Sequence, residues 1–203
     1  MQIFMKKTWL IILTIVMISC VGKTNSKSGV VSKINADTIE NSITSNKSVL
    51  SKDSILVENK IKHVFSNMDS LDEFRIYIKG KSIIDGTVIF RITKDNGDIL
   101  LNEEFPSYLL MGYDFEGNAD SKSDREKFMI NRIKSFFNEK NFLNPAISPN
   151  QTFDEDYSDK EIWDEISADK TRIGFSYILG EEDGRQIAYS KKSNKAVLYF
   201  NCC

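Results

Sequence analysis

Apolar and polar residues alternate in two separate parts of the chain, and this two-residue period predicts β-strands. In the first part, three segments alternate, and Asn96-Gly97 separates the second from the third. Asn-Gly favours a tight hairpin because both central residues of such a turn need positive φ. The apolar positions of the three segments are Phe74, Ile76 and Ile78, then Val88, Phe90 and Ile92, then Ile99, Leu101 and Phe105.

The C-terminal part of the chain predicts three more strands. Asp183-Gly184 predicts the first turn between them, and the stretch KKSNK, residues 191–195, predicts the second. The alternating apolar residues are Ile173, Phe175, Tyr177 and Leu179, then Ile187 and Tyr189, then Val197 and Tyr199.

Three segments carry the spacing of amphipathic helices. Residues 55–68 hold apolar side chains at three- and four-residue intervals, which predicts a first helix. Ser123 with Glu126, and Ser158 with Glu161, have the pattern of a capping box at the start of a helix. The apolar faces of these two helices are Met129, Ile133, Phe136 and Phe137, and then Ile162, Trp163 and Ile166.

The predicted order is therefore α-βββ-α-α-βββ, which is an α+β fold. We expect one antiparallel sheet built from two three-strand meanders, with the helices packed on one of its faces. Residues 55–203 suffice for a single globular domain with one core.

The start of the chain has the pattern of a signal peptide. Lys6 and Lys7 precede an apolar run, Trp9 to Ile18, that is interrupted only by Thr14. A membrane-spanning helix needs roughly 17–25 mainly apolar residues, so this run is too short to serve as one. Residues 1–19 are therefore predicted to be a signal peptide.

Met17-Ile18-Ser19-Cys20 resembles the lipobox of bacterial lipoproteins. The resemblance implies that the Cys20 sulfur carries diacylglycerol through a thioether and that cleavage makes Cys20 the first residue. More than one fatty chain, palmitate for example, gives stable membrane anchoring. The alternative is an ordinary secretory signal that happens to contain a cysteine. No acidic residue lies at positions 21–25, which by the sorting rules of such lipoproteins favours the outer membrane, facing the periplasm.

Composition then divides the mature chain into a tether and a domain. Residues 20–54 are rich in Ser, Asn, Lys and Thr without a lasting apolar period, which is typical of a flexible tether. Residues 20–65 contain 7 Lys/Arg and 4 Asp/Glu, whereas residues 66–203 contain 18 and 25. A basic tether suits an anionic membrane surface. The acidic domain argues against nucleic acid as a partner, because phosphate binding needs a basic face.

The densest charge lies in residues 153–169, where eight acidic residues stand against Lys160 alone. Acidic residues stabilise a helix N-terminus, which accounts for the first half of them. The remainder forms either a solvated helix face or a docking surface for a basic partner. The residues of this predicted docking face are Asp159, Asp164, Glu165 and Asp169.

Other candidate chemistry is sparse. His63 is the only histidine, so a Ser-His or Cys-His system would have to use it, and we expect a surface or boundary residue instead. The oxygen-bearing residues of 114–120 resemble a calcium loop faintly, but Ala119 and Arg125 stand where an EF-hand needs Gly and Glu. The sequence thus predicts no catalytic residue, no metal site and no cofactor.

The chain ends on Cys202-Cys203. If Cys20 is acylated, these two are the only thiols left. A disulfide between neighbours is strained, because adjacent Cα atoms lie closer than disulfides prefer. A vicinal disulfide, a bridge to another chain and two thiols that hold a soft metal are all compatible with the sequence, and an oxidising compartment favours a disulfide.

These patterns predict where the protein is located rather than which activity it has. We expect a lipid-anchored envelope protein whose domain binds another protein or a ligand without catalysis. One alternative is a periplasmic inhibitor or immunity protein that uses the acidic face. Another is a hydrolase that uses a pair of carboxylates, which depends on a separation in space.

Overall fold

A computed structural model describes residues 54–112 and 114–202. All of them belong to one compact unit, Asn46–Cys203. The predicted signal peptide, the lipobox with Cys20, and the predicted tether up to residue 53 lie outside the described residues, as does Cys203. The described part is α+β, as predicted, but it contains two antiparallel sheets of four strands each.

The first sheet, sheet A, is a simple meander in the order β1-β2-β3-β4. One face carries the alternating apolar residues that the sequence predicted for β2 and β3, and these are fully buried. The other face carries charged side chains paired across strands, such as Arg75 with Glu58 at 2.6 Å and Lys60 with Glu73 at 2.7 Å. The strands are β1 Ile55–His63, β2 Asp72–Lys79, β3 Thr87–Thr93 and β4 Ile99–Pro106.

The helix predicted over residues 55–68 is wrong, because this segment is strand β1 and the loop after it. Val57 and Ile61 lie four residues apart, a spacing that places them on one side of a helix and equally on one side of a strand. β1 pairs along its length with β2, with Ile61 opposite Phe74. Pairing with the long apolar strand β2 determined the structure of this segment, which the local spacing of apolar residues could not do.

The hairpin between β3 and β4 is confirmed, with a different turn geometry. Gly97 alone of the predicted pair has positive φ, at 93°. The Gly97 amide donates to the carbonyl of Lys94 at 3.0 Å, and the Lys94 amide donates to the carbonyl of Asp98 at 2.8 Å. This is a three-residue loop with glycine at its left-handed position, rather than a two-residue loop.

The second sheet, sheet B, runs in the order β5-β6-β7-β8. The three C-terminal strands were predicted, whereas β5 was missed because it is only two residues long. The turn between β6 and β7 lies at residues 180–182, before the predicted Asp183-Gly184, and Gly180 there has a φ of 65°. The strands are β5 Phe142–Leu143, β6 Gly174–Leu179, β7 Asp183–Ser190 and β8 Lys195–Cys202.

Two α-helices, α1 Lys122–Ser135 and α2 Lys160–Ser167, and two short 3-10 helices, η1 Ser107–Leu110 and η2 Glu139–Asn141, complete the described part. Both predicted helix caps are wrong in position. Ser121, not Ser123, accepts the Asp124 amide at the start of α1. Asp159, not Ser158, accepts the Ile162 amide at the start of α2. The predicted buried faces are confirmed, with Met129 and Ile133 on α1 and Trp163 and Ile166 on α2.

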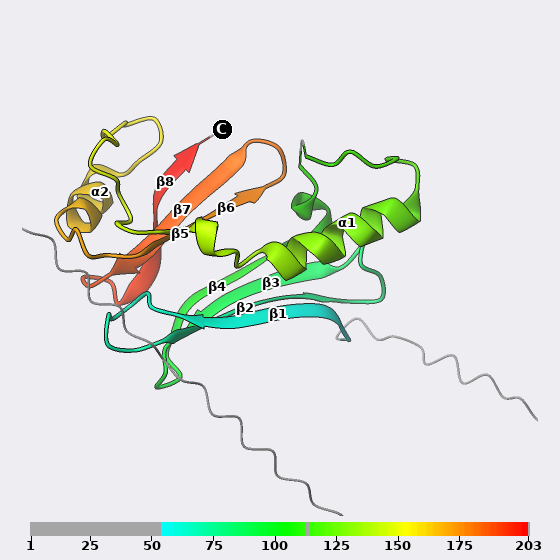
Figure 1. Cartoon of the computed structure of the whole chain (residues 1–203), viewed down its shortest axis with the longest axis horizontal. Coiled ribbons are helices and arrows are strands. Elements are labelled where there is room, and N and C mark those ends of the chain that lie inside the picture. The colour runs from blue at the N-terminus through cyan, green and yellow to red at the C-terminus, as the bar shows by residue number, and fades with distance from the viewer. Residues whose placement is uncertain (1–53, 113, 203) are drawn as a thin grey trace, which may run out of the picture. The chain divides into compact units, whose positions relative to one another are not determined.

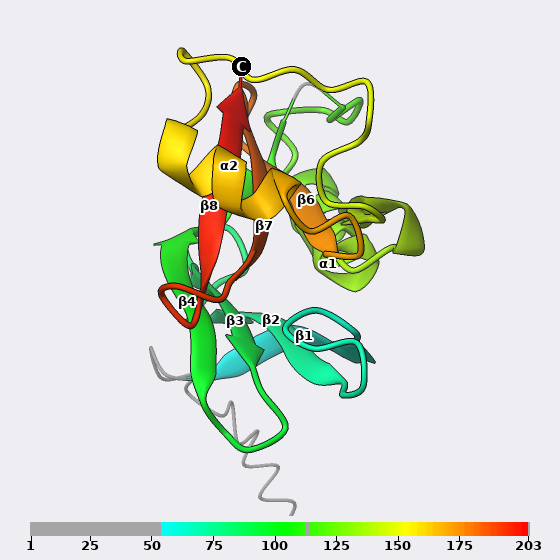
Figure 2. The same ribbon diagram turned by 90° about the vertical axis from the view of Figure 1, so that its left-hand side faces the viewer.

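The elements form layers that the sequence did not predict. Sheet B and α1 lie side by side over the apolar face of sheet A, and α2 covers the opposite face of sheet B (Figures 1 and 2). The expectation of one sheet with all helices on one face is therefore wrong. Two sheets of four strands each bury more apolar surface by facing each other than by joining edge to edge.

Aromatic rings fill the space between sheet A on one side and sheet B with α1 on the other. The Phe175 ring of sheet B lies 5.6 Å from that of Phe74 and 5.8 Å from that of Phe136. Tyr177 packs edge-on against Phe90 at 5.4 Å. Each of these pairs joins residues that are distant in sequence, so this cluster fixes how the two sheets and α1 pack together.

Polar contacts also fix α1 on sheet A. The side-chain amide of Asn59 on β1 donates to the carbonyls of Ile133 and Lys134, each at 3.0 Å. These carbonyls belong to the last turn of α1, where backbone acceptors lack partners within the helix. The sheet thereby caps the end of the helix.

Candidate functional site

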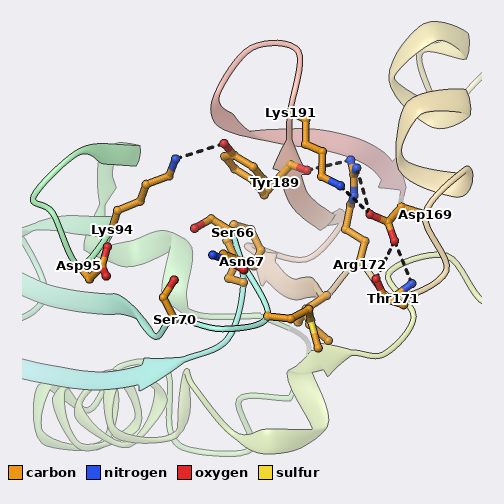
Figure 3. A pocket seen from close by; sticks show the side chains of 13 residues that line it. Ser66, Asn67, Ser70, Lys94, Asp95, Asp169, Thr171, Arg172, Tyr189 and Lys191 are labelled. Carbon is orange, nitrogen blue, oxygen red and sulfur yellow. Dashed lines mark hydrogen bonds and ion pairs between the residues drawn. The ribbon is translucent and has the colours of Figure 1, made fainter.

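A cavity with a volume of about 530 Å³ lies at one end of sheet A (Figure 3). Four parts of the chain converge on it: the β1–β2 loop, the β3–β4 turn, the α2–β6 connection, and the end of β7 with the turn that follows it. A cavity of this size falls in the range of small-molecule sites. Its lining residues are Phe65, Ser66, Asn67, Met68, Ser70, Lys94, Asp95, Asp169, Thr171, Arg172, Ile173, Tyr189 and Lys191.

The β1–β2 loop forms one wall of the cavity, and a buried carboxylate fixes its shape. Asp72 is fully buried at the start of β2. Its two oxygens accept from the Ser66 amide at 2.6 Å and from the Ser66 hydroxyl at 3.0 Å. Phe65 is buried beside them, whereas Met68 stays 54% exposed at the rim. The loop is thus anchored at its base and open at its tip.

Lys94 stands on the side of the cavity formed by the β3–β4 turn. Its Nζ donates to the Tyr189 hydroxyl at 3.1 Å and to Asn194 Oδ1 at 2.8 Å. The same Nζ lies 4.8 Å from the centre of the Tyr189 ring, a cation–π distance. These contacts join sheet A to the β7–β8 turn through neutral groups only.

Arg172 stands on the opposite side, buried at 7% exposure. Its guanidinium donates to the carbonyl of Tyr189 at 2.9 Å and to Glu165 Oε1 at 3.5 Å, and it lies 3.7 Å from Asp169 Oδ2. A buried guanidinium needs both a counter-charge and hydrogen-bond acceptors, and these three groups supply them.

Glu165 on α2 is held ionised next to Arg172. Burial opposes ionisation, but it is outweighed by hydrogen bonds from the Ser190 hydroxyl and the amides of Lys192 and Lys191, and by the Arg172 charge, so the pKa of Glu165 lies below its ordinary value. The Ser190 hydroxyl is 2.9 Å away and the Lys191 amide 2.8 Å away. Glu165 therefore fastens α2 to the end of β7.

Asp169 lies on the cavity wall itself. The Thr171 hydroxyl donates to it at 2.7 Å and the Lys191 ammonium at 3.1 Å. The hydrogen bonds from Thr171 and Lys191 lower the pKa of Asp169 well below its ordinary range. At neutral pH this side of the cavity is consequently a network of ionised side chains.

The structure brings two of the four predicted docking residues together and separates the others. Glu165 and Asp169 both face Arg172, and only Asp169 lines the cavity. Asp159 serves as the cap of α2, and Asp164 is exposed and pairs with Lys160 at 2.6 Å. That the four form one docking face stays a prediction.

The other residues singled out in the sequence lie elsewhere. The His63 ring is half-buried at the end of β1 and stacks on Phe142 at 3.7 Å. In the loop of residues 114–120, Asp114 makes a two-pronged ion pair with Arg132 at 2.9 and 3.1 Å. Among residues 54–112 and 114–202, no group of three His, Cys, Asp or Glu side chains is placed to hold a metal. Cys202 is half-buried at the end of β8, and the predicted disulfide stays a prediction.

Sequence reasoning missed Lys94, Arg172 and Tyr189. Their hydrogen bonds span 17 and 95 residues of chain, and none belongs to a motif. The only local signal was position, because Lys94 and Tyr189 adjoin turns that were predicted. Loop residues on a rigid scaffold often carry binding sites, but sequence does not tell which loops meet.

Comparisons with known proteins give this chain no relative: no protein family, no curated protein sequence and no solved structure matches it. Among the residues that the structure describes, no helix is long and apolar enough to cross a membrane.

Proposed function

We propose that this chain is a lipid-anchored protein of the bacterial cell envelope, and that its domain binds a ligand or a partner protein in the cavity between the two sheets. The observation that carries the proposal is the position of the cavity. The cavity lies at the end of sheet A where His63 pairs with Asp72, whereas β1 begins at the other end, where Ile55 pairs with Lys79.

This arrangement suits an anchored binding domain. The nine residues of β1 separate the two ends by about 25–30 Å. A domain held by lipid at Cys20 would then present the cavity on the side away from the point where the tether joins it. The lipobox-like Met17-Ile18-Ser19-Cys20 would attach the protein to the membrane, and the cavity would provide the binding site.

The chemistry of the cavity supports binding rather than bond cleavage. Hydrolysis by two carboxylates needs one of them as a proton donor with a raised pKa. Asp95 and Asp169 are the carboxylates that line the cavity, and the pKa of Asp169 is lowered. Asp169 therefore does not suit the acid role, so a hydrolase that uses this pair would have to take Asp95 as its proton donor.

An inhibitor that docks through its acidic face stays a prediction. Asp164 is exposed, but Glu165 and Asp169 are engaged with cations of the chain itself. A basic partner would have to compete with Arg172 and Lys191 for them. The observations favour the cavity over this face.

The anchor is tested with the full chain expressed in bacteria. Cys20→Ser should move the protein from the membrane fraction to the soluble periplasmic fraction, and mass spectrometry should find the diacylglycerol adduct only in the wild type. Cys202→Ser is the matched control and should stay in the membrane fraction. Wild-type protein without the adduct would contradict the anchor.

Binding is tested in the same cells with a photo-crosslinking amino acid at a single position. Placed at Met68, on the rim of the cavity, it should give a discrete crosslinked product or a mass shift. Placed at exposed Glu116, on the loop before α1, it should not. Equal products from both positions would argue against the cavity as the binding site.

A further inference from the structure

We infer that the cavity takes a singly charged organic carboxylate, with the carboxylate at Lys94 and an apolar body against Phe65 and Ile173. The inference rests on the proposed function, namely that the cavity is a binding site, and it specifies the chemistry of the ligand.

Lys94 carries a charge that no acidic residue of the described chain balances. The residue is half-buried, and no carboxylate of the described residues lies within ion-pair distance of its ammonium. The other two cations of the cavity, Arg172 and Lys191, both have acidic partners. A partly desolvated charge without a counter-charge is costly, and an anionic ligand would remove that cost.

The β1–β2 loop adds two further donors to the cavity. Ser70 and Asn67 both line it, and neither the Ser70 hydroxyl nor the side-chain amide nitrogen of Asn67 makes a hydrogen bond within the described part of the chain. Figure 3 places the β1–β2 loop residues between Lys94 on one side and Arg172 on the other. A carboxylate next to Lys94 could accept from this loop as well, and charge-assisted hydrogen bonds are the strong ones.

The lining of the cavity limits the ligand to one negative charge and favours an apolar part. Asp95 follows Lys94 on the β3–β4 turn and Asp169 lies on the opposite side, so a ligand with several negative charges would be repelled. Phe65 and Ile173 are buried side chains that reach the cavity, and Met68 extends the apolar surface to the rim. The lining thus suits one negative charge joined to an apolar group. A peptide C-terminus and a small free acid share this chemistry.

Met68 provides a local reporter for the test. The full chain, purified in detergent with methyl-labelled methionine, gives a Met68 signal that Met68→Leu identifies. Benzoate serves as the small free acid, N-acetylphenylalanine as the peptide C-terminus, and benzamide as the neutral counterpart of benzoate. We expect a saturable shift of Met68 with a carboxylate and affinity weaker by about tenfold or more for benzamide.

Two variants separate charge from fold. Lys94→Gln should weaken carboxylate binding by about tenfold or more. Lys79→Gln should not weaken it, because Lys79 is a half-buried lysine on the far face of sheet A with its own partner, Glu104, at 3.9 Å. The signal of fully buried Met129 should be unchanged in both variants, which shows that the core is intact.

The relative affinities of the two carboxylates tell a free acid from a peptide end. Equal shifts with benzoate and benzamide, or undiminished binding by Lys94→Gln, would overturn the inference while leaving the cavity as a binding site. No shift of Met68 with any of the three compounds would overturn it too. Failure of the proposed function would appear separately, as loss of the Cys20 adduct or of position-specific crosslinking.

Discussion

The hydroxyl of Tyr177 on β6 donates a hydrogen bond of 2.8 Å to Glu103 Oε2 on β4, and so links the two sheets at their common face. Tyr177 is 4% exposed, and burial together with the Glu103 charge raises the pKa of its hydroxyl above the ordinary value. The hydroxyl therefore stays a donor at any physiological pH. Arg185 Nη1 lies 3.4 Å from Glu103 Oε1 and balances its charge.

Removing this donor should weaken the packing of the sheets. We expect Tyr177→Phe to lower the free energy of unfolding by about 1–2 kcal/mol, because a hydrogen bond to a carboxylate is lost while the ring stays packed. Tyr108→Phe should leave it unchanged, since Tyr108 is 60% exposed. Urea denaturation of both variants measures the difference. An equal free energy of unfolding for Tyr177→Phe and Tyr108→Phe would mean that water replaces the Tyr177–Glu103 hydrogen bond without a loss of stability.

Glu165 and Asp164 are neighbours on α2, and we expect a large contribution to stability from the first and a small one from the second. Glu165→Ala leaves Arg172 buried without its closest carboxylate and frees the amides of Lys191 and Lys192, so we expect a loss of about 3 kcal/mol. Asp164→Ala removes an exposed pair with Lys160 and should cost less than about 0.5 kcal/mol. Thermal or chemical denaturation of the two variants checks the contrast. Similar losses would refute the buried ion pair.

Asp169 should make stability depend on pH in the acid range. Its pKa in the folded chain lies below the ordinary value of 3.8, so below about pH 4 the unfolded chain takes up a proton that the folded chain does not. This contribution is therefore complete only above about pH 5, and it is lost progressively as the pH falls below that value.

The variant Asp169→Asn tests this assignment. At pH 7 we expect it to be less stable than the wild type by about 1–2 kcal/mol, and the gap should narrow towards pH 3. Asp120→Asn, on the exposed loop before α1, should show no gap at either pH. Denaturation curves at pH 7, 4 and 3 provide the measurement. A gap that is constant with pH would contradict the role of the Asp169 charge.

The start of α1 offers a test with two serines two residues apart. Ser121→Ala removes the side chain that accepts the Asp124 amide at 3.2 Å and should cost about 1 kcal/mol. Ser123→Ala lies inside the helix and should be neutral or slightly stabilising, because alanine is the better helix former. The reverse order of stabilities in urea would place the cap where the sequence predicted it.

The sequence by itself determined which face of most elements is buried. Phe74, Ile76 and Ile78 on β2, and Phe175 and Tyr177 on β6, are buried as their alternation predicted. Burial on one side of a strand or helix imposes a short period, and a short period can be read locally. The hairpin at Gly97 could be predicted for the same reason, because turn chemistry is local.

Only the tertiary structure decided how these elements combine. Val57 and Ile61 fit a helix and a strand equally, and pairing with β2 made that segment a strand. Nothing in the chain indicated two facing sheets instead of one, because the preference depends on surfaces that meet only after folding.

The position and lining of the cavity also depend on the tertiary structure. Of the predicted docking residues, only Asp169 lines it, and the cations around it come from three separate connections between elements. Lys94 and Tyr189 are 95 residues apart and meet because sheet B packs over sheet A. Local patterns specify the elements, whereas a binding site made of loops depends on how those elements are stacked.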